Sequence, residues 1–527
     1  MNPVANHLKN AGERRAGSLL ANQLCCLCFL LFAAFAANAV ASESLLILKP
    51  DAFAHYVERF NSTEDENVTN FISNAESWNW LQKEIPFFEC PDREVEEIYY
   101  FRWWSFRKHL ERTPAGFVFT EFLTRPAPVS SALGHQLMEG RWLHDQNYLD
   151  DYVRYWLSSQ TNRVQLHKYS GWLADALYQR YLVVSDEKFV TSLLPDLIRD
   201  YQQWEKERQT PGGGLFWQYD VRDAMEESIS GSRTNQNLRP TINSYMFGNA
   251  RAIARVARMT GDTKVAEEFD AKAVQLQKLA LRYLWNRTDG FFEVLRDDNK
   301  FSHAREEIGF IPWYFELPPD ERKFDVAWTQ LADPQGFSAP YGITTAERRH
   351  PQFRSHGYGH CEWDGAVWPF ATSQTLGALA NFLRDYKQSV VSSRDYFDAF
   401  LTYVQSQHAD GKPYIGEYLD ETTGQWINGK AGRSRYYNHS TFADLVIGGV
   451  VGLRPRADDV VEISPLLPEG TWDWFCLDGV KYHGRTLTIL WDKDGTRYHR
   501  GKGLMVLVDG KQIARADKLS QLTGKLP

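Results

Sequence analysis

The chain has 527 residues, with 59 lysines and arginines against 67 aspartates and glutamates, so its formal net charge is -8. A composition that is 43% hydrophobic and 24% charged is ordinary for a globular protein and excludes a disordered one. The mild acidity argues against a nucleic-acid partner, because the chain has no excess of basic residues to follow a phosphate backbone. Aromatic residues, at 14%, are the unusual feature. They suit sugar stacking and core packing equally, so composition only nominates a carbohydrate ligand.

The first 41 residues have the organisation of an export signal. Lys9, Arg14 and Arg15 precede an apolar run, and a small-residue stretch ends in A-x-A at 39–41. These are the parts of a cleavable signal peptide, which predicts a secreted or periplasmic mature protein. A single membrane anchor is the alternative, but the apolar run is short for a bilayer, and no later segment approaches a spanning length.

The mature chain would keep few cysteines and has no cofactor motif. Only Cys90, Cys361 and Cys476 remain after cleavage, which allows at most one disulfide and forms no CxxC pair. We find no zinc, calcium-loop, Walker, dinucleotide or G-x-S-x-G pattern. The sequence therefore predicts no metal site and no cofactor, and leaves only a structural calcium open.

Residues 42–94 indicate an irregular, partly helical lead-in, and residues 95–455 are dominated by apolar residues at steps of three and four. The segments 242–259 and 264–285, joined through Gly261, predict a helical hairpin with a glycine stop. Further helices are expected at 141–159, 168–184, 190–204, 321–332, 366–386, 393–408 and 439–452. Continuous helix pairs favour a helical toroid over a bundle, although periodicity does not fix how the pairs close.

The last segment, 456–527, changes to β-rich runs, at 458–467, 485–492 and 503–517. Asp478-Gly479, Asp494-Gly495 and Asp509-Gly510 punctuate it, and Asp-Gly supplies the positive φ of tight hairpin turns. We therefore expect a small antiparallel β-module at the end of the chain.

The loop at 212–233 concentrates carboxylates beside aromatic residues, on a glycine-rich stretch before a helix. Its acids are Asp220, Asp223, Glu226 and Glu227, and its other notable side chains are Trp217, Tyr219 and Arg233. Burial among aromatic rings raises the pKa of a carboxyl group, which a general acid near neutral pH requires. The alternative is a polar surface loop that caps the next helix.

A second acidic loop spans 411–432. Glu417 has aromatic neighbours able to enclose it, at Tyr414, Tyr418 and Trp426. Asp420 and Glu421, beside the Thr423-Gly424 turn, are more typical of a solvated hairpin.

Trp363, Trp368 and Phe370 cluster with Glu362 and Asp364 in the segment 358–376. They suit either a wall that stacks on a sugar ring or core packing at a helix start.

The segment 436–449 places Tyr437, Asn438 and His439 before the last predicted helix. A histidine there is more often a capping or core residue than a catalyst.

These loops resemble those of the helical-toroid glycoside hydrolases that include trehalases, family 63 α-glucosidases and mannosylglycerate hydrolases. The acid loop of that group, G-[MW]-D-x-S, is similar to A-M-E-E-S at 224–228, and its base loop, E-x-Y-x-x-x-T-G, to E-Y-L-D-E-T-T-G at 417–424. Its substrate wall, Y-W-R-G-P-x-W, is similar to C-E-W-D-G-A-V-W at 361–368. The three elements keep their order and wide separation over residues 212–445.

The resemblance implies a mainly α fold, an (α/α)6 toroid of the six-hairpin type with the small C-terminal antiparallel β-module. It implies an inverting mechanism in which Glu226 is the general acid and Glu417 the general base, with their carboxyls about 6.5–9.5 Å apart. The wall motif places Trp363 and Trp368 against the substrate. From the composition of these loops we further expect substrate contacts at Trp217, Tyr219, Asp223, Arg233, Asp364, Tyr418 and His439.

Three departures from the group's pattern stand out. Glu226 replaces an aspartate, Ala224 a glycine, and Asp364 an arginine. These changes leave the mechanism in place and the substrate open. Asp223 and Glu227 remain rivals for the acid role.

The sequence thus predicts an exported glycosidase that cleaves an α-linked oligosaccharide or glycoside, with no nucleic-acid partner and no membrane span after cleavage of the signal. A second hypothesis is a uronate lyase on a similar toroid. Tyr437 or His439 would then abstract the proton, and Asn438 with Arg433 or Arg435 would neutralise the substrate carboxylate. A third is a non-catalytic carbohydrate-binding protein. The sugar, exo or endo action, and the oligomeric state are not determined at this level.

Overall fold

The structure, a computed structural model, describes residues 46–125, 127–357, 361–427 and 434–527. The predicted signal peptide at 1–41 lies outside these residues. Residues 48–527 form one compact unit. None of the helices in the described ranges is both long and apolar enough to cross a membrane.

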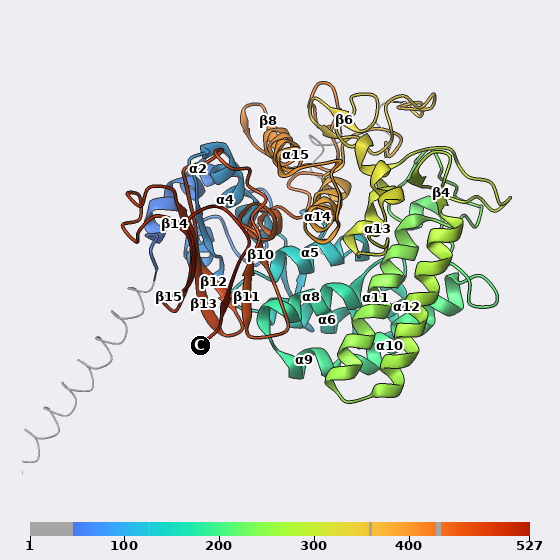
Figure 1. Ribbon diagram of the computed structural model, residues 1–527, viewed down its shortest axis with the longest axis horizontal. Helices are drawn as coiled ribbons and strands as arrows, with labels where there is room; N and C mark the ends of the chain where they lie inside the picture. Colours follow the sequence, from blue (N-terminus) through green and yellow to red (C-terminus); the bar gives the residue numbers. More distant parts are fainter. Residues whose placement is uncertain (1–45, 126, 358–360, 428–433) are drawn as a thin grey trace, which may run out of the picture. The chain divides into compact units, whose positions relative to one another are not determined.

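Helices are the main regular secondary structure of this unit (Figure 1). The α-helices are α2 (Ala54–Ser62), α3 (Ser77–Glu84), α4 (Arg93–Arg107), α5 (Leu133–Gly140), α6 (Asn147–Ser158), α7 (Gln160–Leu166), α8 (Leu173–Val184), α9 (Glu187–Ser192), α10 (Leu194–Arg208), α11 (Pro240–Met259), α12 (Thr263–Tyr283), α13 (Ile311–Tyr314), α14 (Pro369–Asp385) and α15 (Ser393–Ser406). The 3-10 helices are η1 (Pro50–Phe53), η2 (Ser130–Ala132), η3 (Asp220–Arg222), η4 (Glu307–Phe310) and η5 (Arg322–Gln330), and η6 (Leu445–Val451) is a π-helix.

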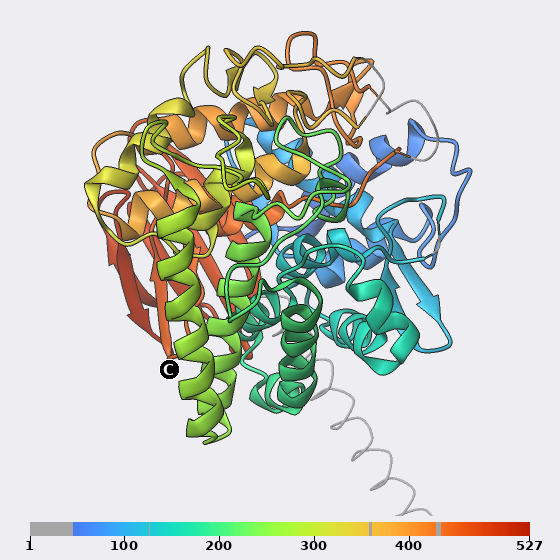
Figure 2. The same cartoon turned by 90° about the vertical axis from the view of Figure 1, so that its right-hand side faces the viewer.

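The predicted helical hairpin is confirmed as α11 and α12, which lie side by side in both views (Figures 1 and 2). Pro240 begins α11, where its missing N–H costs no hydrogen bond. Gly261 turns the chain with φ 77°, and the Asp262 carboxylate accepts a hydrogen bond from the Val265 amide at 3.0 Å to cap α12.

Other predicted helices are interrupted or shorter than expected. The segment 190–204 is divided between α9 and α10, because Pro195 fits only the first turn of a new helix. The segment 321–332 forms the 3-10 helix η5. The expected helix at 439–452 is reduced to η6, because the amides of the preceding residues bind a carboxylate of α5, as described below.

The sheets confirm an antiparallel module at the C-terminus. The two larger ones have the strand orders β1-β12-β13-β14-β15 and β10-β11-β16. Their strands are β1 (Phe87–Glu89), β10 (Leu453–Arg454), β11 (Val460–Ile463), β12 (Trp474–Tyr482), β13 (Arg485–Asp492), β14 (Gly503–Val508), β15 (Lys511–Ala516) and β16 (Leu522–Lys525). Two-stranded pairs are β2 (Leu110–Thr113) with β3 (Gly116–Phe119), β4 (Trp285–Asn286) with β5 (Phe291–Phe292), β6 (Ser338–Ala339) with β7 (Gly342–Ile343), and β8 (His408–Ala409) with β9 (Lys412–Pro413).

The three Asp-Gly pairs behave differently. Asp509-Gly510 forms the predicted two-residue turn between β14 and β15, with φ 49° and 77°. Asp494-Gly495 lies in the longer connection from β13 to β14. The turn predicted at Asp478-Gly479 is wrong, since the pair lies inside β12 at a bulge where Gly479 has φ 81°. The buried Asp478 carboxylate accepts a hydrogen bond from Thr488 Oγ1 at 2.6 Å instead.

β1 comes from the predicted lead-in and pairs with β12, so the larger sheet is not built from residues 456–527 alone. Much of the aromatic excess lies in the core rather than on a binding surface. Trp103, Trp104, Trp142, Trp156, Trp172, Trp313 and Trp328 are each at most 1% exposed. The mainly α fold with a C-terminal antiparallel sheet is confirmed, and the closure of the helix pairs into a toroid stays a prediction.

Candidate active site

A cavity of about 250 Å³ lies among the connections between helices, a volume that suits one or two sugar rings. Glu226 and Glu417 both line it, together with Glu121, Phe122, Arg125, Val129, Ser131, Lys168, Tyr169, Ala224, Cys361, Trp363, Trp368, Phe370, Tyr437 and His439. The three loops identified in the sequence therefore meet at one place.

The acid loop is fixed from below by a buried ion pair. Arg239, at the end of the loop, donates from Nε to Asp223 Oδ2 at 2.7 Å, and both side chains are fully buried. The Met225 amide donates to the Asp220 carbonyl at 3.0 Å, which folds the chain back just before Glu226. The Asp223 carboxylate therefore forms a structural ion pair with Arg239 at the base of the loop.

Ala224 has a positive φ of 60°, in the left-handed region. The motif that this loop resembles carries glycine at the corresponding place, and glycine has no Cβ to clash there. The turn that presents Glu226 to the cavity therefore holds a strained alanine.

Glu226 has the electrostatics of a general acid. Its pKa is raised to about 7, chiefly by burial and further by the negative charges of Glu417 and Asp220, while Arg233 acts in the opposite direction. Glu226 is therefore substantially protonated near neutral pH. The influence of Glu417 on this pKa reflects the closeness of the two carboxyls.

Glu417 is 4% exposed, and its Oε2 accepts a hydrogen bond from Ser434 Oγ at 3.1 Å. Its loop is joined to the wall segment by reciprocal backbone hydrogen bonds of 3.0 Å between Val367 and Leu419. Gly416 lies against Trp426, where an added Cβ would come within 2.6 Å of the indole. Long-range pairing and close packing thus hold this carboxylate in place.

One wall of the cavity is a stack of three aromatic rings. Trp363 and Trp368 lie 4.4 Å apart at 24°, and Trp368 and Tyr418 lie 4.5 Å apart at 11°. The Trp363 Nε1 is buried without a hydrogen-bond partner among the described residues. The wall thus offers ring surface for sugar C–H groups and an indole donor for a hydroxyl.

His439 is 2% exposed and packs on Tyr437 at 4.2 Å between ring centres. Burial, with the nearby His135 and Arg102, holds the pKa of His439 well below its usual range, so the imidazole is neutral. Its Nε2 has no hydrogen-bond partner in the described part of the chain. A neutral ring of this kind can exchange a hydrogen bond with a sugar hydroxyl.

The segment that carries His439 is anchored by two buried charged residues. The Glu139 carboxylate accepts hydrogen bonds of 2.9–3.1 Å from the amides of Phe442, Ala443 and Asp444. Arg102 donates to the Ser440 carbonyl at 2.8 Å. These contacts explain both the position of His439 and the late start of η6.

Several predicted substrate contacts lie outside the cavity wall as the described residues form it. They are Trp217, Tyr219, Asp223, Arg233, Asp364 and Tyr418. Tyr418 supports the wall from behind Trp368. Asp364 is fully buried, and its Oδ2 accepts a hydrogen bond from the His356 amide at 2.9 Å. Arg233 pairs with Glu227, the other rival for the acid role, at 3.3 Å.

Some lining residues were not singled out from the sequence, notably Glu121, Arg125, Lys168 and Tyr169. They lie in short connections after β3 and α7, and their position between elements is the only local signal they carry. The pKa of Tyr169 is raised to about 12 by burial and by the charges of Glu226 and Glu121.

The residues proposed for a lyase are not assembled here. Asn438 donates from Nδ2 to the Thr120 carbonyl at 3.1 Å, and Arg435 donates to the Tyr436 hydroxyl at 3.2 Å. Neither lines the cavity as described, and Arg433 lies outside the described residues. Tyr437 and His439 do line the cavity.

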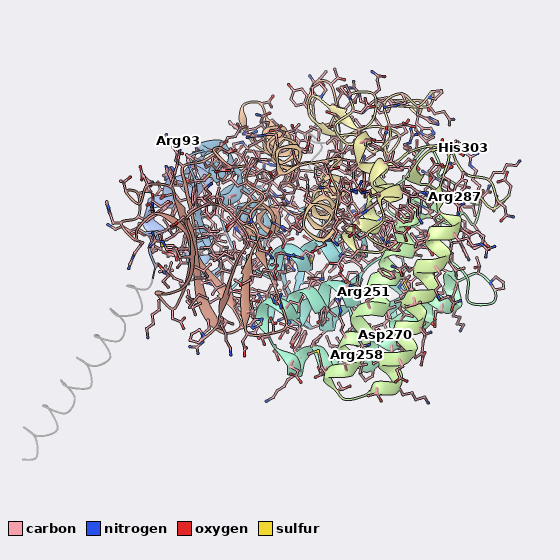
Figure 3. All side chains as sticks on the ribbon, viewed as in Figure 1. Arg93, Arg251, Arg258, Asp270, Arg287 and His303 are labelled. Atoms are coloured by element: carbon pink, nitrogen blue, oxygen red, sulfur yellow. The ribbon has the colours of Figure 1, made fainter. Side chains whose placement is uncertain are left out.

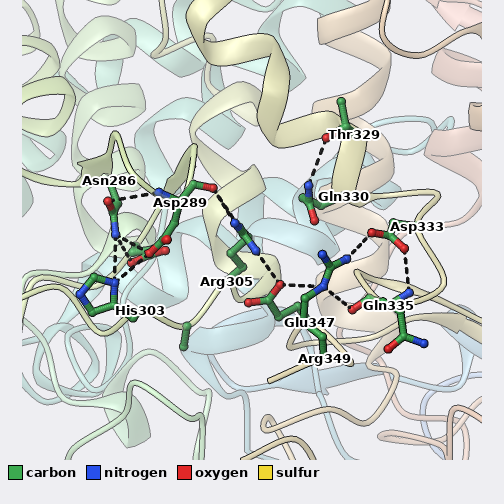
Figure 4. Close-up of polar contacts among 12 residues, drawn as sticks. Asn286, Asp289, His303, Arg305, Thr329, Gln330, Asp333, Gln335, Glu347 and Arg349 are labelled. Atoms are coloured by element: carbon green, nitrogen blue, oxygen red, sulfur yellow. Dashed lines mark hydrogen bonds and ion pairs between the residues drawn. The ribbon is translucent and has the colours of Figure 1, made fainter. Parts of the chain in front are cut away.

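Among the described residues, one cluster has the spacing of metal ligands, Asp289, Glu293 and His303. Figure 4 shows Asp289 and His303 of this cluster beside Asn286. Asn286 accepts a hydrogen bond from the Thr288 amide, which fixes its orientation, and its Nδ2 donates to Asp289 at 2.6 Å and to Glu293 at 2.9 Å. An amide donor therefore points at the carboxylates where a cation would bind. The donor set does not fit the structural calcium that the sequence left open.

Comparison with known proteins agrees with this geometry. Residues 125–440, more than half of the chain, match the family model of the mannosylglycerate hydrolase MGH1-like glycoside hydrolase domain. The chain belongs to this family. Residues 453–515 match the C-terminal domain of glycosyl hydrolase family 65. The resemblance drawn from the acid, base and wall motifs is thereby confirmed.

Relatives of this MGH1-like protein are distant or longer. The periplasmic trehalase of Escherichia coli O17:K52:H18 is 24% identical over 38% of this chain and 32% of its own length. A sialidase structure is 50% identical with a TM-score of 0.89, and the match covers 92% of this chain but 45% of the sialidase chain. The family 63 mannosylglycerate hydrolase of Thermus thermophilus, in complex with glucose, has a TM-score of 0.50 and 15% identity over 66% of this chain and 99% of its own, which supports the fold.

Proposed function

We propose that the protein is an exported glycoside hydrolase that cleaves an α-linked glycosidic bond with inversion, using Glu226 as general acid and Glu417 as general base. The observation that carries this proposal is a carboxyl with a pKa near 7 in the same cavity as a second, buried glutamate. Two carboxyls placed on either side of a sugar are the machinery of glycoside hydrolysis.

The proposed reaction is a single displacement. Glu226 gives its proton to the glycosidic oxygen as the bond from that oxygen to the anomeric carbon breaks. Glu417 takes a proton from a water molecule, whose oxygen attacks the anomeric carbon from the opposite face. Glu226 ends ionised and Glu417 protonated, and proton exchange with solvent restores both.

The other lining residues support this chemistry by positioning. The ring faces of Trp363 and Phe370 suit the apolar face of a sugar, and the unpartnered Trp363 Nε1 and His439 Nε2 suit its hydroxyls. The neutral imidazole of His439 keeps a competing positive charge away from the two acids. The glucose complex of the Thermus relative supports a hexose-sized ligand.

The first test is a panel of α-linked disaccharides and aryl α-glycosides, with the product anomer followed by NMR. We expect hydrolysis in which the first product formed has the opposite anomeric configuration to the substrate. Retention of configuration would exclude the proposed role of Glu417. A product with ultraviolet absorption would indicate an unsaturated uronate and a lyase.

Two variants separate the acid from the base. Glu226→Gln should keep activity on α-glycosyl fluorides, whose leaving group needs no proton, while losing it on disaccharides. Glu417→Ala should regain turnover when azide is added, and it should form a glycosyl azide of inverted configuration. Glu227→Gln is the matched control and should behave as the wild type. If neither variant shows its diagnostic behaviour, the assigned roles are wrong.

Export is tested by sequencing the N-terminus of the mature protein. Cleavage after residue 41 would give a chain that begins at Ser42. The periplasmic location named for the trehalase relatives supports this expectation. An uncleaved chain that stays bound to the membrane would show that the N-terminal segment is a membrane anchor.

A further inference from the structure

A larger hollow of about 530 Å³ adjoins the cavity, between α7, α10 and η3. It gathers basic side chains although the chain as a whole is acidic. Its cations are Arg163, Lys168, Arg199, Arg208 and Arg222, and its carboxylates are Asp200 and Glu207. We call this surface the basic groove.

The carboxylates of the basic groove are already engaged. His167 bonds Asp200 through Nε2 at 2.9 Å and Glu207 through Nδ1 at 3.2 Å. Arg163 and Arg199 both pair with Asp196 at 2.8 Å. These contacts account for both acids and for two of the cations.

Three cations of the groove have no carboxylate within ion-pair distance in the described part of the chain. They are Lys168, Arg208 and Arg222. Arg208 lies over the Trp217 ring at 4.5 Å, and its buried Nε has no hydrogen-bond partner among the described residues. A guanidinium held on an indole in this way is already oriented before a ligand arrives.

The basic groove and the catalytic cavity share a wall. Lys168 lines both hollows. The Ser170 amide donates to the Arg222 carbonyl at 2.9 Å, which joins the Lys168 segment to η3. Ala224, two residues beyond Arg222, lines the cavity beside Glu226. A glycan that leaves the cavity across this wall would therefore enter the groove.

We infer that the basic groove binds an anionic extension of the glycan substrate, with Lys168 at the shared wall and Arg222 and Arg208 farther along. This inference rests on the proposed function, because it assumes that the cavity holds a sugar of the same chain. Carboxylate and sulfate groups both present a pair of negatively charged oxygens. A guanidinium group binds such a pair with two parallel hydrogen bonds. Three uncompensated cations beside a sugar-sized cavity match an acidic oligosaccharide better than a neutral one.

Calorimetry on the full chain tests the groove without requiring turnover. The probes are tetragalacturonic acid, its fully methyl-esterified form, which has the same sugars without the charges, and maltotetraose carrying sulfate esters. We expect an acidic tetrasaccharide to bind about 10-fold more tightly than the neutral ester, and this preference to fall as salt rises. Preference for the first or the last probe assigns carboxylate or sulfate as the recognised group.

The double variant Lys168→Met/Arg222→Met should lose about 10-fold in affinity for the acidic probe and little for the ester. Arg287→Met is the matched control, since Arg287 is exposed on the turn between β4 and β5 and forms no ion pair among the described residues (Figure 3). It should bind like the wild type. Thermal melting confirms that each variant is folded.

Equal affinity for the acidic probes and the ester, an absence of binding by both acidic probes, or an equal loss in Arg287→Met would overturn the inference. The two proposals fail separately. If the protein hydrolyses neutral α-glycosides and shows no preference for acidic ones, the inference about the groove is wrong and the proposed enzymatic function stands. If the protein prefers the acidic probes but hydrolyses no glycoside, anion binding by the groove stands and the proposed hydrolase function is wrong.

Discussion

Two glutamates of this protein, the half-buried Glu226 and the buried Glu293, have similarly raised pKa values in different surroundings. The pKa of Glu226 is raised to about 7 and that of Glu293 to about 8, in both by burial and by a neighbouring carboxylate. Glu226 faces a cavity of about 250 Å³, whereas Glu293 accepts a hydrogen bond from Asn286 and lies in a cluster with Asp289. A perturbed pKa is therefore insufficient for catalysis without space for a substrate and a second carboxyl across it.

The largest expected difference between the two glutamates is in activity. Glu226→Gln should lower kcat on an unactivated α-glycoside by about 10²–10⁴-fold, the range typical of a lost general acid. Glu293→Gln should leave kcat within about 2-fold of the wild type, since nothing in its cluster lines the cavity. Steady-state kinetics with both variants checks this. Similar losses of kcat in both variants would show that the cavity does not distinguish the role of Glu226 from that of Glu293.

The stability of the folded chain should depend on the pH through Glu293. Its folded-state pKa of about 8 lies above the unfolded value, so folding takes up a proton and the stabilising contribution falls as pH rises towards 8. In Glu293→Gln, the side-chain amide replaces the protonated carboxyl as a hydrogen-bond donor to Asp289. The amide does not titrate. We expect the free energy of unfolding of the variant to exceed that of the wild type by about 5 kcal/mol at pH 9, and the two values to converge at pH 5.

Denaturant unfolding at both pH values measures this difference. His303→Gln serves as the control for disturbing the same cluster, because it removes the hydrogen bond to Asp289 and leaves Glu293 in place. A difference in stability between Glu293→Gln and the wild type that is the same at pH 5 and pH 9 would show that Glu293 does not titrate as proposed.

The pH profile of activity should follow Glu226 and ignore Glu293. The alkaline limb of kcat/KM should lie near pH 7, where Glu226 loses its proton. Arg233 lowers this pKa, so Arg233→Gln should move the limb to higher pH by about half a unit. Glu293→Gln should leave the limb where it is, and a shift in that variant would mean that the two sites are coupled.

The smallest expected effect is on stability, and it comes from the backbone conformation of a residue near each glutamate. Ala224 and His303 both have a positive φ, of 60° and 53°. Ala224→Gly should relieve strain and stabilise the fold by about 0.5–1 kcal/mol, after the greater entropy of glycine in the unfolded chain is subtracted. Thermal melting measures the gain. A loss of stability would show that the alanine methyl packs better than its φ suggests.

Much of the site followed from local sequence. The acid loop, the base loop and the aromatic wall were found as short motifs, and Glu226, Glu417, Trp363, Trp368 and His439 all line the cavity. Arg125, Lys168 and Tyr169 were missed, because a connection without a motif gives no sign of what it faces. The proposed contacts at Trp217 and Arg233 lie outside the wall, since closeness in sequence to Glu226 does not place a side chain on the same face of the loop.

The sequence by itself determined features that depend on residues near one another in the chain. The α11–α12 hairpin follows from helical periodicity and Gly261, and the turn at Asp509-Gly510 follows from the φ values that this dipeptide tolerates.

Only the tertiary structure decided what depends on distant partners. It brought Glu417 to Glu226, joined β1 to β12, turned Asp478-Gly479 into a bulge, and assembled a basic groove on an acidic chain. The physical reason is that cavities, sheet partners and charged surfaces arise from long-range packing, and no local pattern in the chain encodes which segments will meet.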